Sequence, residues 1–226
     1  MTPNQVTAAR VVAAFAAVAL FSLGVHALAA DLTAVFLTIA AIALDGVDGY
    51  LARTRGLATA LGAQFDILGD RVVENLFFTC FAVAGLISLW VPVLFFVRGT
   101  LTDFLRSLAS RAGRSGFGRN SMLEARWGRN LVASRASRAA YAVLKCVCFC
   151  SLGLVLSLRH LPDAQVVSSV GVPAASWLLL GARVLTTLTV SFCILRAVPV
   201  IWEGRRYLNA AEPAPKPVTV AVTVSR

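Results

Sequence analysis

The sequence has 226 residues and a net charge of +10; 58% of its residues are hydrophobic and its mean hydropathy is +0.77. Soluble domains are roughly half apolar, so this composition excludes an ordinary soluble domain and indicates a membrane protein. The positive charge does not indicate a nucleic-acid partner, because the basic residues lie between apolar runs and no recognition motif accompanies them.

In chain order, the apolar runs predict an interfacial lead-in over residues 1–10 and then six spanning helices, since a span needs about 20 mostly apolar residues. The expected spans are residues 11–29, 32–44, 62–90, 93–109, 139–158 and 183–202. Residues 159–182, interrupted by Pro173, are expected to form an outer loop with a partial helix. The predicted fold is all-α: residues 1–210 form one membrane domain, a six-transmembrane-helix bundle, and residues 211–226 form a mobile tail.

The distribution of arginine predicts the orientation of this polytopic bundle. Nine arginines fall between Arg98 and Arg138, whereas the links at residues 26–31 and 90–92 contain no Lys or Arg. The positive-inside rule places the arginine-rich segment, and with six spans both termini, in the cytoplasm. A cleaved signal peptide is the alternative for residues 1–30, but the apolar run is longer than a usual signal and only Arg10 precedes it.

Four aspartates cluster between positions 45 and 70. Asp45 and Asp48 are three residues apart, and Asp66 and Asp70 are four apart, so on helices each pair lies on one face. If the link over residues 54–61 turns the chain back, the two faces can meet. Four carboxylates in a low-dielectric setting repel one another and need a cation. Oxygen ligands favour Mg²⁺ or Mn²⁺, and two such ions can bridge a diphosphate.

The residues around these aspartates suit a phosphorylated ligand. Gly49, Ala52 and Gly62 are small and allow close approach, and Arg53 offers a fork of donors to a phosphate. The whole pattern resembles the signature of the CDP-alcohol phosphatidyltransferases with every spacing kept. That pattern reads Asp45-x-x-Asp48-Gly49-x-x-Ala52-Arg53, then eight residues, then Gly62-x-x-x-Asp66-x-x-x-Asp70.

The resemblance implies an enzyme of phospholipid biosynthesis, usually dimeric, with its CDP-lipid and metal sites near the cytoplasmic face of the inner membrane. It implies that Asp45, Asp48 and Asp66 are metal ligands and that Asp70 is a metal-associated general base. The residues that it assigns to the CDP-lipid site are Gly49, Ala52, Arg53 and Gly62. The implied reaction is attack of an alcohol on the β-phosphorus of CDP-diacylglycerol, with release of CMP.

The acceptor alcohol is predicted from basic residues elsewhere. The Arg98 to Arg106 stretch and the opening Pro3-Asn4-x-x-Thr7-x-x-Arg10 are similar to segments of phosphatidylglycerophosphate synthases, which favours glycerol 3-phosphate. The side chains expected to bind its phosphate are Arg98, Arg106, Arg129 and Arg138.

Gly99 replaces a usual Glu of that branch, and Ile67-Leu68-Gly69 also departs from it. Inositol phosphate therefore stays an alternative acceptor. A small cation transporter is the non-enzyme alternative, although the aspartates lie near span ends rather than at the bilayer centre.

Overall fold

The computed structural model describes residues 2–22, 28–54, 59–114, 121–160 and 172–208. At residues 3, 28, 45–54, 60, 160 and 172–175 it describes the backbone alone. Within these ranges the chain forms helices and no β-strand. The six long helices are α1 (Pro3–Ser22), α2 (Leu28–Thr54), α3 (Ala60–Val83), α4 (Trp90–Arg111), α6 (Arg135–His160) and α8 (Val172–Gly204). Two shorter elements, α5 (Arg126–Ala133) and the 3-10 helix η1 (Arg205–Tyr207), complete the described part.

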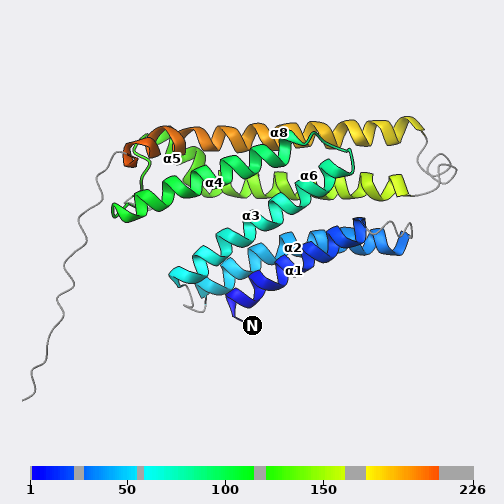
Figure 1. The fold of residues 1–226 in the computed structure, drawn as a ribbon, viewed down its shortest axis with the longest axis horizontal. Helices are drawn as coiled ribbons and strands as arrows, with labels where there is room; N and C mark the ends of the chain where they lie inside the picture. Colours follow the sequence, from blue (N-terminus) through cyan, green and yellow to red (C-terminus); the bar gives the residue numbers. More distant parts are fainter. Residues whose placement is uncertain (1, 23–27, 55–58, 115–120, 161–171, 209–226) are drawn as a thin grey trace, which may run out of the picture.

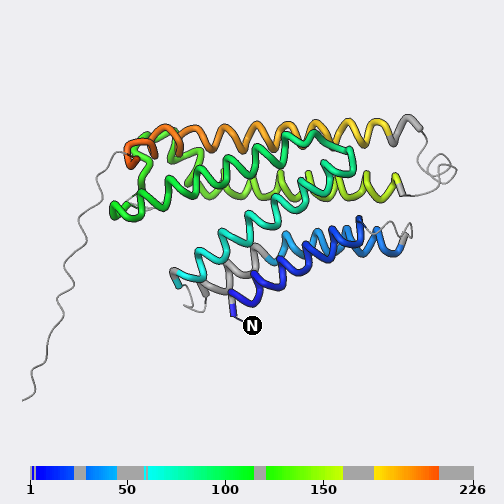
Figure 2. Tube along the Cα trace, viewed as in Figure 1, coloured from blue at the N-terminus to red at the C-terminus, as the bar shows by residue number. Residues whose placement is uncertain are grey.

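Helix α3 occupies the middle of the bundle. It runs obliquely between the pair α1 and α2 on one side and the group α4, α6 and α8 on the other (Figure 1). Helix α3 packs against α1, α4 and α6, while α2 also contacts α6 and thereby closes the bundle. The Cα trace in Figure 2 follows the same course: α8 lies along the top of the view, and α6 packs beside it.

An aromatic cluster fixes α3 at this central position. Phe77, Phe78 and Phe81 are fully buried on α3. The Phe78 ring lies 4.3 Å from the Phe95 ring of α4 and 4.8 Å from the Phe149 ring of α6, measured between centroids. Aromatic pairs at such separations contribute beyond the apolar area that they bury. Since the charged residues of α3 precede these rings in sequence, the cluster sets where those charges lie.

The outer faces of the helices are apolar, as expected for contact with lipid. Phe36, Phe96, Val143 and Trp177 are among many large hydrophobic side chains that are more than half exposed. Soluble monomers rarely expose contiguous apolar surface on this scale. Within the described residues three helices are long and apolar enough to cross a membrane: Asn4–Ser22, Arg135–Arg159 and Ser176–Tyr207. The helices are therefore consistent with a membrane protein.

The remaining long helices meet that criterion less well for identifiable reasons. Helix α2 is 27 residues long, but its side chains are described only over the apolar stretch Ala29–Leu44. Helices α3 and α4 each carry several charged residues within any span-length window. The six-span count and the cytoplasmic position of both termini therefore stay predictions.

Several predicted boundaries were wrong. Helix α1 begins at Pro3 rather than after Arg10, because the polar residues taken as an interfacial lead-in lie on a helix face that packs against α3. Helix α8 begins at Val172, so Pro173 lies in its first turn, where proline needs no backbone hydrogen bond. The predicted outer loop is therefore shorter than expected, and residues 161–171 and the tail over 211–226 lie outside the described residues.

Helix α5 was not predicted, and it is held at both ends by α8. The buried carboxylate of Glu203 accepts hydrogen bonds from the backbone amides of Glu124 and Ala125, which precede the helix. At the other end the buried Arg196 guanidinium donates to the carbonyl oxygens of Leu131, at 3.0 Å, and Val132, at 3.1 Å. An eight-residue helix is marginal by itself, so these contacts with α8 explain why α5 forms.

We expect Glu203→Ala to lower the free energy of unfolding by about 1–3 kcal/mol, because two amides at the start of α5 lose their buried acceptor. Thermal unfolding of the purified protein in detergent measures this loss. Glu124→Ala is the control: its carboxylate pairs with Arg206 at 2.7 Å, and both side chains are about 60% exposed. Exposed pairs contribute little, so the control should unfold like the wild type. Equal losses in the two variants would contradict the capping role of Glu203.

Candidate active site

Asp66 and Asp70 of α3 share one guanidinium. Arg10 of α1 donates to Oδ1 of Asp70 at 2.9 Å and to Oδ1 of Asp66 at 3.1 Å, and also to the backbone oxygen of Asp66 at 3.2 Å. The predicted common face of the two aspartates is thereby confirmed. Arg10 is 1% exposed, whereas the side chains of Asp66 and Asp70 are 44% and 42% exposed. The carboxylates thus have a buried cation on one side and an accessible surface on the other.

A polar stripe on α1 makes this contact. Asn4, Thr7 and Arg10 are spaced three residues apart and lie against α3. A Cβ atom added at Gly69 would lie 2.8 Å from Cγ2 of Thr7 and 2.9 Å from a guanidinium nitrogen of Arg10. At Gly62 it would lie 3.0 Å from Oδ1 of Asn4. The two glycines let the polar stripe approach the aspartates.

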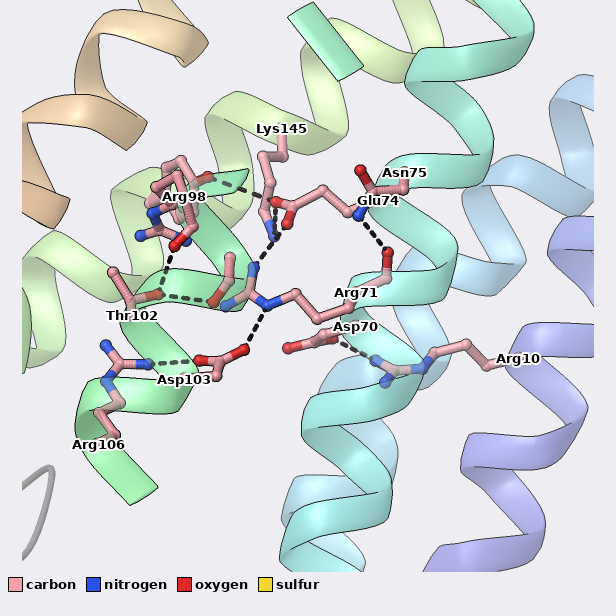
Figure 3. Close-up of polar contacts among 12 residues, drawn as sticks. Arg10, Asp70, Arg71, Glu74, Asn75, Arg98, Thr102, Asp103, Arg106 and Lys145 are labelled. Atoms are coloured by element: carbon pink, nitrogen blue, oxygen red, sulfur yellow. Dashed lines mark hydrogen bonds and ion pairs between the residues drawn. The ribbon is translucent and has the colours of Figure 1, made fainter. Parts of the chain in front are cut away.

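A second set of charges begins at the next residue of α3. Arg71 donates to Oδ2 of Asp103 at 2.9 Å and to Oε2 of Glu74 at 2.8 Å. Arg106 donates in turn to Oδ1 of Asp103 at 3.4 Å. Figure 3 shows Asp70 between Arg10 on one side and this network, which joins α3 to α4, on the other.

Glu74 extends the network to α6. Its carboxylate is 3% exposed, lies 3.2 Å from Nζ of Lys145 and accepts a hydrogen bond from the Tyr141 hydroxyl at 3.4 Å. A cavity of about 50 Å³ lies beside it, lined by Arg10, Asp70, Glu74 and Lys145 together with apolar residues of α2, α3 and α6. The cavity connects the two sets of charges.

Arg98 of α4 lies at the edge of this network. Its buried Nε has no hydrogen-bond partner within the described part of the chain. Asp103, an acid on the same helix, is bonded to Arg71 and Arg106. Gly99 explains the position of Arg71, because a Cβ there would lie 3.0 Å from Cδ of Arg71. Glycine at position 99, where the phosphatidylglycerophosphate synthases usually have Glu, thus makes room for the Arg71 side chain.

The first half of the predicted signature is described only in part. Helix α2 runs through Asp45 and Asp48, so their helical spacing is confirmed. The side chains of Asp45, Asp48, Gly49, Ala52 and Arg53 lie outside the described residues. Among the side chains that are described, no group of three or more His, Cys, Asp or Glu residues is placed to hold a metal ion.

The predicted acceptor arginines divide into two groups. Arg98 and Arg106 both lie on α4, close to Arg71 and Glu74. Arg129 is exposed on α5, and Arg138 is exposed on α6, where its charge acts on Arg196. The structure therefore brings the first pair, but not Arg129, toward the charges that follow Asp70.

The chain matches a family model over most of its length. The family model described as CDP-alcohol phosphatidyltransferase covers residues 1–189, which include all four signature aspartates and the charged residues around them. The chain belongs to the CDP-alcohol phosphatidyltransferase family. No curated protein matches the sequence.

Membership establishes the class of reaction. The CDP-alcohol phosphatidyltransferases transfer substituted phosphate groups, so the chain is an enzyme and not the small cation transporter considered as an alternative. The family acts in phospholipid head-group transfer from a CDP-alcohol and generally depends on divalent metal ions.

Sequence reasoning missed the residues that surround the aspartates. Arg10 was recognised only as part of the opening motif, and its spacing from Asn4 and Thr7 was the signal that it faces another helix. Glu74 and Lys145 were assigned no role, because a pairing between α3 and α6 cannot be read from either helix alone. Arg71 and Glu74 are three residues apart on α3, and this spacing could have indicated their ion pair at 2.8 Å.

We expect Glu74→Ala to destabilise the protein by about 3–5 kcal/mol, because it removes the buried carboxylate that pairs with Arg71 and Lys145. Thermal unfolding in detergent is the measurement. The double variant Glu74→Gln with Lys145→Gln should lose less than the sum of the two single Gln variants, since it removes both members of the pair. Strict additivity would contradict the pairing.

Proposed function

We propose that the chain transfers the phosphatidyl group of CDP-diacylglycerol to glycerol 3-phosphate and releases CMP. The observation that carries the proposal is the convergence of Asp66 and Asp70 on one cation, next to a network rich in arginine. The family supplies the donor half of this reaction, and the network supports a phosphorylated acceptor.

The described donor set fits a divalent metal ion. Asp66 and Asp70 offer carboxylate oxygens, which hard ions such as Mg²⁺ and Mn²⁺ prefer, and the pair already accommodates one positive group, the Arg10 guanidinium. Together with Asp45 and Asp48 they would hold two ions. When bound, the ions would neutralise the charge that develops on the leaving phosphate.

Asp70 is proposed as the general base. The acceptor hydroxyl loses its proton to the Asp70 carboxylate while its oxygen bonds to the β-phosphorus of CDP-diacylglycerol. The bond from that phosphorus to the bridging oxygen breaks, and the electron pair leaves with CMP. The exposed part of the Asp70 side chain gives the hydroxyl access, and the Arg10 bond holds the carboxylate in orientation. The cytidine side of the site is assigned to Gly49, Ala52, Arg53 and Gly62.

The acceptor phosphate is assigned to the cations beyond Asp70. Arg71, Arg98, Arg106 and Lys145 carry four positive charges, against the two negative charges of Glu74 and Asp103. A partly buried excess of positive charge favours an anionic ligand. The buried Nε of Arg98 adds a donor for a phosphate oxygen. Arg129 and Arg138 are proposed to attract the phosphate from the cytoplasm rather than to enclose it.

The number of membrane spans, their orientation and the oligomeric state are part of the same proposal. Six spans with both termini in the cytoplasm would put the aspartates at the inner face of the cell's inner membrane, where the soluble acceptor is available. Their place early in α3, well before the aromatic cluster, supports this depth. The chain is proposed to act as a homodimer, as the resemblance implies.

The experiment is CMP release by the purified protein in detergent with CDP-diacylglycerol and Mg²⁺ or Mn²⁺. We expect release with glycerol 3-phosphate and none with inositol 1-phosphate, serine or water alone. EDTA should abolish release, and added Mn²⁺ should restore it. Release with inositol 1-phosphate alone would contradict the acceptor while keeping the reaction, and release that resists EDTA would contradict the role of the metal.

A further inference from the structure

The contact between Arg10 and the two aspartates has a consequence for metal binding. Arg10 is the only charged residue in the sequence of α1, and it is 1% exposed at the end of the polar stripe that it forms with Asn4 and Thr7. Burying a charge is costly unless it is paired and hydrogen-bonded. Its ion pairs with Asp66 at 3.1 Å and Asp70 at 2.9 Å offset the unfavourable free energy of burying the charge.

Arg10 also reduces the repulsion between Asp66 and Asp70. Two carboxylates one turn apart repel each other, and the repulsion grows as the surroundings become less polar. One guanidinium touches both and also bonds the backbone oxygen of Asp66. Gly69 makes this contact possible, since an added Cβ would lie 2.9 Å from the guanidinium.

We propose that Arg10 is a built-in counter-cation of the Asp66–Asp70 pair, which stabilises the metal-free protein and lowers the affinity of the site for a divalent ion. The inference rests on the proposed function, because it takes these aspartates as metal ligands. Arg10 and a metal ion would each neutralise the same two carboxylates, and two cations at one anionic site repel each other. By linkage, each must weaken the binding of the other by the same factor.

A purely structural Arg10 would behave differently. If it only tied α1 to α3, its loss would lower thermal stability equally with and without metal. A counter-cation predicts that metal replaces the missing charge, so that the stability deficit shrinks when metal is bound. The comparison of melting temperatures with and without Mn²⁺ separates the two roles without any measurement of activity.

The test uses Arg10→Gln, which keeps a donor but removes the charge, and Arg10→Lys, which keeps the charge. Mn²⁺ affinity is measured on the purified protein by the electron paramagnetic resonance signal of free Mn²⁺. Arg10→Gln should bind Mn²⁺ about tenfold more tightly than the wild type, since one unit charge close to the ion is removed. Its melting temperature should fall in EDTA and recover largely in Mn²⁺. Arg10→Lys should bind Mn²⁺ within about threefold of the wild type.

Arg183→Gln is the matched control. This arginine of α8 donates to the carbonyl oxygen of Leu86 at 3.1 Å, beyond the other end of α3. Its replacement should leave Mn²⁺ affinity unchanged and shift the melting temperature equally in EDTA and in Mn²⁺.

Gly69→Ala is the second variant should Arg10→Gln fail to fold. The added methyl group displaces the guanidinium from the aspartates, so Mn²⁺ should again bind more tightly, by a smaller factor. Unchanged or weaker Mn²⁺ binding in both Arg10→Gln and Gly69→Ala would overturn the inference while leaving the proposed function intact. Absence of Mn²⁺ binding by the wild type would instead overturn the proposed metal site and the inference with it.

Discussion

The structure depends on the compensation of negative charge inside a bundle of apolar helices. Carboxylates within such a bundle need nearby cations, and this chain supplies them through ion pairs between helices. Arg10 of α1 pairs with Asp66 and Asp70, Lys145 of α6 pairs with Glu74, and Arg71 of α3 pairs with Asp103 of α4. The same contacts that neutralise the charges therefore hold α1, α4 and α6 around α3.

This arrangement links fold to chemistry through one helix. The rings of Phe77, Phe78 and Phe81 fix α3 in the apolar core, and its charged residues precede them in sequence. Small residues at Gly62 and Gly69 admit α1, and Gly99 of α4 admits Arg71. An enzyme of the CDP-alcohol phosphatidyltransferase family thus has its proposed base, Asp70, between a cation on one side and an arginine-rich network on the other.

Local pattern and spacing made much of this predictable. The apolar runs located six long helices, and the spacing of Asp66 and Asp70 placed both carboxylates on one face. Helix ends were missed at Pro3 and Val172, because the polar residues before Val11 were taken as an interfacial lead-in and Pro173 was taken as an interruption. Helix α5 was missed because Glu203 and Arg196, which are distant in sequence, stabilise it. Pairings between helices, such as Arg10 with Asp66, have no local signal.

The central claim is that a carboxylate of α3 performs the chemistry, and the rate of CMP release by Asp70→Asn tests it most directly. We expect kcat/KM to fall by about 10²–10⁴-fold, the usual contribution of a general base, with the protein still folded. Asp31→Asn, a buried acid at the start of α2, should retain near-normal activity as the control. Near-normal CMP release by folded Asp70→Asn would contradict the account.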